Sequence, residues 1–542
     1  MNMDYLYHPF TSRRHTVFAK NGIVATSQPL AAQVGIEIMR HGGNAIDAAI
    51  ATAAALTVVE PTGNGIGGDS FALIWTKGEL HGLNASGPSP KSITAEKVKA
   101  LGHDKMPVYG AVPVTVPGTP ASWAEVSRKF GKLSLRETLQ PAIQLAEEGF
   151  PLTPILGKYW RIAYDKFKAM SDNSPEEEKM FAAWFETFAP DGRPPEIGEI
   201  WSAPGHADTL RQIAETDGRA FYEGPLAEKI AATVKEHGGF LTAQDLADYQ
   251  VEWVDPVSTN YRGYDVWEIP PNGQGMVALM AMNIHTADGY KPVYGEVETL
   301  HRQIEAMKLA FTDGKAFITE EAEMPVKVEE LLSEEYAEER ARQIGEKAML
   351  PEPYDPVKAG TVYLATADSE GNMVSFIQSN YMGFGSGVVV PGTGIALQNR
   401  GADFSLDTEH ANYLQPGKKT FHTIIPGFLT KDGEAVGPFG VMGGFMQPQG
   451  HFQVVSNTVD FGLNPQAALD QPRWQWTGGK TVHVEPDFPN HLAQALQRKG
   501  HDIHVMTDSG SFGRGQIIWR DPDTGVLQSG TESRTDGAIA VW

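Results

Sequence analysis

The segment Gly360-Thr361-Val362-Tyr363-Leu364-Ala365 carries the strongest prediction about the fold and chemistry of this chain. Cleavage of the chain before Thr361 would give this one residue two roles. Its hydroxyl can attack a carbonyl, and the α-amino group released beside it can act as the general base. An unperturbed α-amino group has a pKa of about 7.7–8.0, close to neutral pH. The segment therefore predicts a chain that cuts itself to expose a threonine nucleophile for amide hydrolysis.

A β-hairpin is predicted to start at Thr361. Residues 361–367 and 373–379 read as strands around the turn 368–372, so a symmetric hairpin places Thr361 opposite Ser379. Opposed residues of an antiparallel pair have Cβ atoms about 4.5–5.5 Å apart. We therefore expect the two hydroxyls to form a hydrogen bond, which a slip of one residue in register would break.

The composition and periodicity of the sequence change just before Thr361. Residues 349–360 contain three prolines and no periodicity, which predicts an irregular, exposed connector. Helices are predicted before it at residues 29–41, capped by Ser27, at residues 45–59, capped by Asn44, and at residues 300–317 and 328–346. After the connector, short strands dominate and only residues 490–499 read as a helix. A strand at residues 71–75 indicates that both portions can share sheets.

The overall composition excludes several classes of protein. The 542 residues are 41% hydrophobic and can bury a large core, while 44 basic against 67 acidic residues give a net charge of -23. This charge disfavours nucleic acid and anionic membranes as partners. With no cysteine, disulfides, thiolate metal sites and cysteine nucleophiles are excluded. We find no signal-peptide pattern and no apolar run of membrane-spanning length, so we expect a cytoplasmic protein. No cofactor or metal is predicted.

Further motifs extend from one end of the chain to the other. In the first portion they lie at residues 42–49, 116–119, 147–150, 261–264 and 305–311. In the second portion they are Gly360-Thr361, Gly371-Asn372, Phe384-Gly385-Ser386-Gly387, Asp403-Phe404-Ser405 and Gly443-Gly444. Along nearly its whole length the sequence resembles the γ-glutamyltranspeptidase family of N-terminal-nucleophile hydrolases. Its departures from the family pattern look more like the cytoplasmic branch that includes oxamate amidohydrolase and cephalosporin-acylase-like proteins.

This resemblance implies a fold and a set of catalytic residues. The fold is α+β, a four-layer αββα sandwich formed as one structural domain by a large subunit, residues 1–360, and a small subunit, residues 361–542. Thr361 is the nucleophile with Ser379 beside it, where the family usually has a second threonine. By the same resemblance, Gly443 and Gly444 supply backbone N–H donors to the oxyanion, and glycine suits this role because no side chain blocks close approach.

The resemblance also indicates an altered substrate pocket. In γ-glutamyl enzymes of the family an aspartate holds the substrate α-amino group, and Asp403 stands in its place. The α-carboxylate is usually held by an arginine and two serines, where this chain has Asn84 and His422-Thr423. Tyr381 replaces an asparagine, and Arg400 replaces a glutamine or glutamate. We hypothesise that Arg400 binds the substrate carboxylate, and the alternative is an ion pair with an acid such as Asp403.

The predicted reaction is amide hydrolysis through an acyl-threonine intermediate, on a γ-glutamyl or short acidic acyl group of the oxamate or glutaryl kind. One alternative is a standard glutathione hydrolase or γ-glutamyltransferase. Another is a non-catalytic family member that acts as a binding protein. The expected partner of the protein is a small-molecule amide substrate. The two fragments of the cleaved chain are also expected to stay bound to each other. Whether water or an amine accepts the acyl group is left open, as is a homodimer.

Two further patterns point to other chemistry and are rejected. Residues 63–68 fit the glycine fingerprint of dinucleotide sites, but a helix-like segment precedes them and a strand follows, whereas that motif needs a strand before it and a helix after. His501 and His504 are three residues apart and can suggest a metal site, but a surface strand is the better interpretation.

Overall fold

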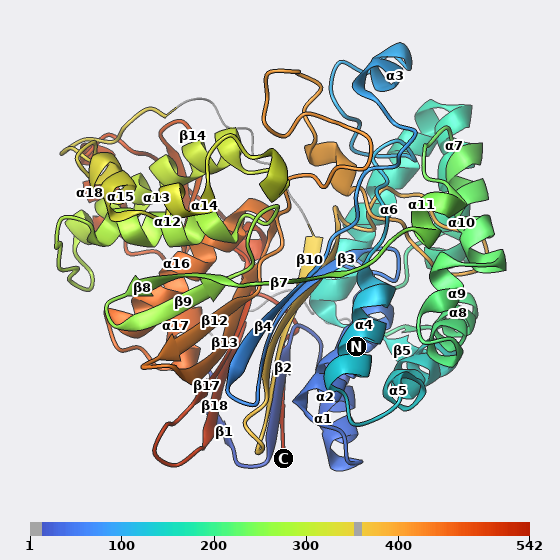
Figure 1. The fold of residues 1–542 in the computed structure, drawn as a ribbon, viewed down its shortest axis with the longest axis horizontal. Helices are drawn as coiled ribbons and strands as arrows, with labels where there is room; N and C mark the ends of the chain where they lie inside the picture. Colours follow the sequence, from blue (N-terminus) through green and yellow to red (C-terminus); the bar gives the residue numbers. More distant parts are fainter. Residues whose placement is uncertain (1–12, 352–359) are drawn as a thin grey trace, which may run out of the picture.

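The computed structural model describes residues 13–351 and 360–542 (Figure 1), and two seven-stranded sheets form its centre. In order, the first sheet contains β1 (Val17–Ala19), β18 (Leu527–Thr531), β17 (Arg514–Arg520), β13 (Glu434–Met442), β12 (Gly427–Lys431), β9 (Tyr264–Glu268) and β8 (Val257–Tyr261). The second contains β19 (Ala538–Val541), β2 (Gly22–Thr26), β10 (Gly360–Asp368), β11 (Met373–Tyr381), β3 (Asp69–Thr76), β4 (Glu79–Ala85) and β7 (Glu252–Val254). Strands from before and after Thr361 are therefore neighbours in both sheets.

Helices cover the outer faces of the two sheets (Figure 1). On the side of the second sheet lie α1 (Pro29–Arg40), α2 (Ala45–Val59), α4 (Thr119–Phe130), α5 (Leu135–Glu148), α6 (Pro154–Asn173), α7 (Pro175–Phe188), α8 (Pro204–Glu215), α9 (Arg219–Tyr222), α10 (Pro225–Glu236) and α11 (Ala243–Ala247). On the side of the first sheet lie α12 (Gly275–Thr286), α13 (Val297–Phe317), α14 (Val328–Leu331), α15 (Glu334–Ala341), α16 (Gln447–Val459), α17 (Pro465–Asp470) and α18 (Asn490–Arg498).

Smaller elements complete the chain. They are α3 (Ala95–Ala100), the pair β5 (Phe150–Pro151) and β6 (Ile200–Trp201), the small sheet of β14 (Trp474–Gly478), β15 (Thr481–Val484) and β16 (Asp502–Val505), and the 3₁₀ turns η1 (Glu321–Glu323), η2 (Arg400–Asp403), η3 (Gly444–Met446) and η4 (Ser509–Ser511).

Three apolar cores separate the four layers. Ile23, Tyr363 and Phe428 belong to a core between the two sheets. On β10 the side chains alternate, since Tyr363 faces this core whereas Val362 and Leu364 belong to the core under the helices of the second sheet. A third core joins α12, α13 and α16 to the first sheet. The predicted αββα sandwich is thus confirmed, with β10 buried on both faces.

Helix α2 shows why the second sheet can be covered so closely. All its side chains are buried, and seven of its fifteen residues are alanine, so neighbouring backbones can pack closely against it. The Asn44 side chain accepts hydrogen bonds from the N–H groups of Ile46 and Asp47, and Asp47 accepts from the Asn44 N–H in return. This capping box fixes the start of the helix as the sequence predicts.

The predicted hairpin register is confirmed beyond the first residue. Val362 lies opposite Gln378, and the pairing continues without a slip to Ala367 opposite Met373. An irregularity at the start of β10 sets Gly360 opposite Tyr381. Most of the predicted connector, residues 352–359, lies outside the described residues.

Several local predictions were wrong. Ser27 does not cap α1, because Gln28 occupies the cap position and the Ser27 hydroxyl donates to the buried Glu60 carboxylate. The helix expected at 328–346 is broken into α14 and α15, with Ser333 capping the second. The second portion also contains α16 and α17, which the sequence did not indicate. In α16 the buried glutamines Gln449 and Gln453 hide the apolar periodicity, and they donate to main-chain oxygens of β14.

Candidate active site

Thr361 lies at the beginning of β10, fully buried between the two fragments that cleavage would create. Its Oγ1 donates to the carbonyl oxygen of Gly360 at 2.7 Å and lies 3.1 Å from Ser379 Oγ. Ser379 Oγ donates to the same Gly360 oxygen at 2.7 Å. Two hydroxyls therefore meet at the carbonyl of the peptide bond before Thr361, and the hydrogen bond predicted between Thr361 and Ser379 is present.

The glycine-rich residues 63–68 make room for this arrangement. A Cβ atom on Gly63 would lie 3.1 Å from the Thr361 carbonyl oxygen and 3.3 Å from its nitrogen. The helix α2 precedes this stretch and the strand β3 follows it. This is the reverse of the order that a dinucleotide fingerprint requires, so the rejection of that motif is confirmed.

Tyr381 adopts an unusual backbone conformation at the edge of the site. Its φ is 73°, in the left-handed region that costs a residue other than glycine about 1–3 kcal/mol. Its N–H donates to Ser379 Oγ at 2.8 Å, and its hydroxyl donates to Asp403 Oδ1 at 2.7 Å. The strained residue thereby links the hydroxyl beside Thr361 to the carboxylate of the predicted pocket.

Arg400 is the central cation of the site, and its side chain is 1% exposed. Its Nη1 donates to Thr423 Oγ1 at 2.6 Å and lies 3.7 Å from Asp403 Oδ2, while Nη2 donates to Ser379 Oγ at 3.5 Å. Its Cζ lies 4.2 Å from the centre of the Tyr381 ring. The ion pair with Asp403, one of the two alternatives for Arg400, is present. A contact of Arg400 with a substrate carboxylate stays a prediction.

The charge of Asp403 is set by opposing effects. Burial raises the pKa of its carboxyl above the ordinary value, while Lys315 and then Arg400 act against this by attracting the ionised form. Burial lowers the pKa of the Arg400 guanidinium, which Asp403 and Tyr381 oppose. Lys315 was not among the predicted site residues, although it follows the motif at 305–311 on the same helix.

The loop with Gly443 and Gly444 connects to this cluster through Gln274. Gln274 Nε2 donates to the Thr423 carbonyl oxygen at 2.6 Å and to the Gly444 carbonyl oxygen at 2.9 Å. The φ angles of Gly443 and Gly444 are 139° and 57°, and the left-handed region that they occupy favours glycine. Hydrogen bonds thus run from Thr361 through Ser379, Arg400, Thr423 and Gln274 to the glycine loop. No sequence signal singled out Gln274.

His422 and Asn84 lie one layer behind the cluster. His422 Nδ1 accepts from the Ile424 N–H at 3.4 Å, so the ring is protonated on Nε2, which lies 3.1 Å from Asp69 Oδ2. Burial holds the pKa of His422 well below its ordinary value and raises the pKa of Asp69 to about 7. Asn84 donates to Asn272 Oδ1 at 2.9 Å. Among the described residues, His422 and Asn84 therefore hold neighbouring groups of the site in place through these hydrogen bonds.

Asp69 is a further residue of the site that the sequence prediction missed. It lies opposite Ser379 in the pairing of β3 with β11. A prediction of that pairing would have found it, but residue spacing alone does not show which strand lies beside the hairpin.

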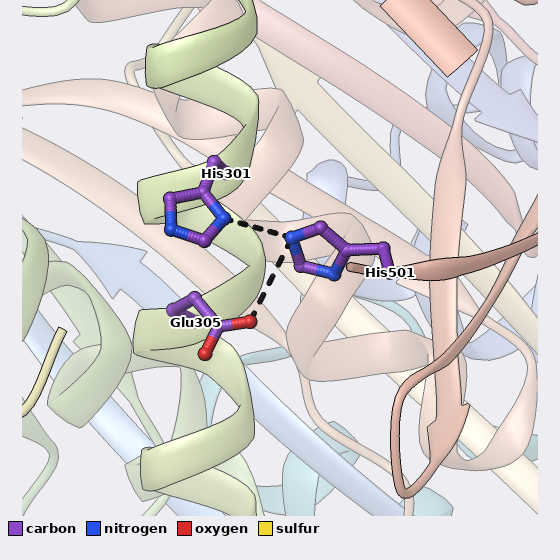
Figure 2. A group of neighbouring side chains, drawn as sticks. All are labelled: His301, Glu305 and His501. Atoms are coloured by element: carbon purple, nitrogen blue, oxygen red, sulfur yellow. Dashed lines mark hydrogen bonds and ion pairs between the residues drawn. The ribbon is translucent and has the colours of Figure 1, made fainter. Parts of the chain in front are cut away.

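A second polar cluster joins α13 to the strand-rich portion (Figure 2). His301 Nδ1 lies 2.8 Å from His501 Nε2, which is 3.7 Å from Glu305 Oε1. These three groups are close enough to suggest a metal site. However, Lys308 Nζ already donates to Glu305 Oε1 at 2.8 Å, and burial together with nearby lysine charges lowers the pKa of His501 to about 2. This positive surrounding opposes a metal cation.

The cluster instead holds the segment that precedes the connector. His301 Nε2 donates to the Gly345 carbonyl oxygen at 2.9 Å, and the Met349 N–H donates to Glu305 Oε2 at 2.9 Å. His504, the second histidine of the suggested metal pattern, lies on the exposed β16 and contacts Asp502 at 2.9 Å. The surface strand preferred for residues 501–504 is confirmed from Asp502 onward, whereas His501 is buried and contacts His301.

Two cavities in the described part of the chain lie away from Thr361. One of about 590 Å³ is lined by residues of α4, α5 and α9, and another of about 660 Å³ lies beside Thr153 and Asp536. Neither is lined by the groups that surround Thr361. The position of the site therefore follows from its chemistry and not from cavity size.

The fold and the site define a class of protein. A buried threonine at the start of a central strand, between two facing sheets covered by helices, is the arrangement of an N-terminal-nucleophile hydrolase. The chain belongs to the gamma-glutamyltranspeptidase family, whose match covers residues 31–542. The recognition made from the motifs is confirmed, and the protein is an N-terminal threonine hydrolase that matures from a self-processing precursor.

Known relatives support this assignment over the full length of the chain. The glutathione hydrolase-like YwrD proenzyme of Bacillus subtilis is 38% identical over 534 residues, covering 96% of this chain and 99% of the relative. The oxamate amidohydrolase proenzyme of Klebsiella pneumoniae is 34% identical, covering 96% and 98%. The crystal structure of cephalosporin acylase from Bacillus halodurans matches with a TM-score of 0.96 and 62% identity, covering 100% of this chain and 99% of that one. Among the described residues, no helix is long and apolar enough to cross a membrane.

Proposed function

We propose that the chain cuts itself between Gly360 and Thr361 and that Thr361 then hydrolyses small amides through an acyl-threonine intermediate. The observation that carries this proposal is the pair of hydroxyls on the Gly360 carbonyl. Thr361 Oγ1 bonds to the Gly360 carbonyl carbon, the Gly360–Thr361 C–N bond breaks, and the hydroxyl proton passes to the released amine. Water then hydrolyses the ester, leaving a carboxylate on Gly360.

After cleavage, fragments 1–360 and 361–542 stay together in one domain, because β10 lies between β2 and β11 inside a sheet. The new α-amino group of Thr361 serves as the general base for its own hydroxyl. Ser379 orients that hydroxyl, as their distance of 3.1 Å allows. The N–H groups of Gly443 and Gly444 stabilise the oxyanion of the substrate.

The acyl group is γ-glutamyl or a short acidic group in this proposal. Asp403, Arg400, Tyr381 and Thr423 form the recognition site, and His422 and Asn84 position its loops. The relative named oxamate amidohydrolase supports the short acidic acyl group, and the neighbour named cephalosporin acylase supports the removal of an acyl group. Asp403 supports the second candidate, a glutathione hydrolase or γ-glutamyltransferase, because its Oδ2 is buried without a hydrogen-bond partner among the described residues and can accept a bond from a substrate ammonium.

The test of the proposed self-cleavage is Ser379→Ala. Loss of its hydrogen bond to the Gly360 oxygen is expected to slow cleavage about 10²-fold, the usual effect of removing one oxyanion donor. A time course on a denaturing gel would follow the 58.9 kDa chain as it divides into fragments of about 39 and 20 kDa, at ~110 Da per residue. Amino-terminal sequencing of the smaller fragment should begin at Thr361.

The matched control is Ser375→Ala on the same strand. Ser375 is also buried, but its hydroxyl lies 2.8 Å from the Tyr363 hydroxyl and away from Gly360. This variant should be cleaved at the wild-type rate. Unchanged cleavage of Ser379→Ala would contradict the role given to Ser379.

The binding role of Arg400 has its own prediction. Arg400→Ala removes the guanidinium that lies 3.7 Å from Asp403 Oδ2, and truncating one partner of a buried charge pair typically costs about 2–5 kcal/mol. We expect KM to rise about thirtyfold or more, with Asp403→Ala raising it as well. Thermal unfolding would show whether each variant is folded. If Arg400→Ala left KM unchanged while Asp403→Ala raised it, Arg400 would have no part in binding.

A further inference from the structure

A second cation lies at the edge of the proposed active site. Lys315 is on the last turn of α13 and is partly exposed. Its Nζ is 3.6 Å from the centre of the Phe445 ring and 4.1 Å from that of Phe421. Such cation–π contacts hold an ammonium in place while leaving it charged. Phe445 directly follows Gly444 and Phe421 comes two residues before Thr423, so Lys315 lies over both loops that form the site.

The charges around Asp403 differ from those of a pocket built for an ammonium alone. Lys315 and Arg400 both act on this one carboxylate, and Lys315 has the larger effect. The Tyr381 hydroxyl already donates to Asp403 Oδ1. Asp403 thus faces two cations, and Asp69 also attracts Arg400. An anionic group of the substrate would be attracted by the ammonium of Lys315.

Two polar atoms beside these cations also form no hydrogen bond with a described residue, although Asp403 Oδ2 lies 3.7 Å from Arg400 Nη1 in their ion pair. Arg400 Nε and Asp403 Oδ2 are buried and form no hydrogen bond within the described residues. A buried donor and acceptor left unpaired cost free energy unless a ligand or water completes them. Their presence beside the two cations indicates that the pocket is made for a polar ligand.

Accessibility distinguishes the two cations. Arg400 is almost completely buried, and its Nη atoms are engaged with Thr423, Ser379 and Asp403. Lys315 is more exposed and lies over the rim formed by Phe421 and Phe445. A carboxylate that contacts the ammonium of Lys315 therefore leaves intact the hydrogen bonds that hold Ser379.

We propose that Lys315 is a specificity-determining residue whose ammonium binds the distal carboxylate of the acyl group. This inference rests on the proposed amide hydrolysis at Thr361. It assigns to Lys315 the carboxylate contact that the sequence led us to expect from Arg400, and Arg400 then contributes to binding by holding Asp403, Thr423 and Ser379 in place. The carboxylate can belong to a simple diacid such as glutaryl or to the α-amino acid end of a γ-glutamyl group.

The experiment compares three p-nitroanilides, glutaryl, γ-glutamyl and the uncharged butyryl, on the self-cleaved protein. Lys315→Met keeps the length of the side chain and removes its charge. We expect the ratio of kcat/KM for glutaryl over butyryl to fall about ten- to a hundredfold, as for a lost hydrogen bond to a charged group. Lys315→Arg should restore much of the ratio. A fall for γ-glutamyl as well would extend the contact to the α-carboxylate of an amino acid.

The matched control is Lys419→Met. Lys419 lies two residues before Phe421, and its Nζ is 2.5 Å from the Glu252 carboxylate. Removing this paired cation should leave the substrate ratio unchanged. An unchanged ratio in Lys315→Met would overturn the assignment of Lys315. Failure of the proposed function would look different, because no fragments would form and none of the three anilides would be hydrolysed.

The pH dependence gives a second readout. Burial lowers the pKa of Lys315 to about 8, against the attraction of Asp403 and together with the repulsion of Arg400. The pKa of His410 is lowered by burial and then by the positive charge of Lys315. The ammonium is therefore lost as the pH rises through about 8, and the glutaryl-to-butyryl ratio should fall in this range. Taking the ratio cancels the titration of the Thr361 amine. A ratio that stayed constant from pH 7 to pH 9 in the wild type would contradict the role of Lys315.

Discussion

Thr361→Ala is expected to remain a single chain of 58.9 kDa and to hydrolyse no amide substrate. The variant lacks the hydroxyl that attacks Gly360, so neither the ester nor the new amino group forms. Loss of a nucleophile that acts together with its base lowers kcat by a factor on the order of 10⁴ or more. A denaturing gel after long incubation, with an anilide assay of the same sample, measures both effects.

Folding of this variant can be checked independently. Thr361 Oγ1 makes its hydrogen bonds with Gly360 and Ser379. When the Thr361 hydroxyl is removed, Ser379 can still donate its hydrogen bond to the Gly360 oxygen. The loss of stability should therefore be small, and thermal unfolding should resemble that of the uncleaved wild type. Thr361→Ser keeps a hydroxyl and should still be cleaved. Fragments from Thr361→Ala that begin at residue 361 would show that another group performs the cleavage.

The sequence predicted the fold most accurately where the local sequence pattern and the tertiary packing agree. The hairpin register followed from turn length and strand symmetry, and α2 followed from its cap and its alanine content. Helix α16 escaped prediction because its buried glutamines satisfy main-chain groups of a different strand. Such tertiary hydrogen bonds allow polar residues in a core but leave no periodicity in the sequence.

The same limit applies to the site. Thr361, Ser379, Tyr381, Arg400 and Asp403 lie within 43 residues of one another in the sequence, and family motifs mark several of them. Asp69, Gln274 and Lys315 come from β3, the start of α12 and the end of α13, far away along the chain. The pairing of β3 with β11 brings Asp69 beside the hairpin, and tertiary packing brings Gln274 and Lys315 to the neighbouring loops. Their contributions therefore depend on contacts that residue spacing does not encode.

Gly443→Ala is expected to give a protein that cleaves itself but turns over substrate slowly. The φ of Gly443 is 139°, and an added Cβ would lie 3.1 Å from Gly513 Cα, so the turn must rotate its peptide groups. Removing one oxyanion donor costs about 10²–10³ in kcat. Self-cleavage should persist because the Ser379 hydroxyl donates the hydrogen bond to the Gly360 oxygen while Thr361 Oγ1 attacks. Gel analysis and steady-state kinetics on one preparation separate the two effects.

The control for backbone strain is Gly433→Ala at the other end of the same strand. Gly433 precedes β13 and has a φ of 81°, but a Cβ there would meet no atom within 4 Å. This variant carries a comparable backbone penalty, of about 1–3 kcal/mol, far from Thr361. Its Tm should fall while its kcat stays at the wild-type value. If Gly443→Ala kept its kcat, or if both variants lost the same fraction of kcat, the oxyanion role of the glycine loop would be refuted. A loss of kcat confined to Gly443→Ala would separate transition-state stabilisation from the general stability of the fold.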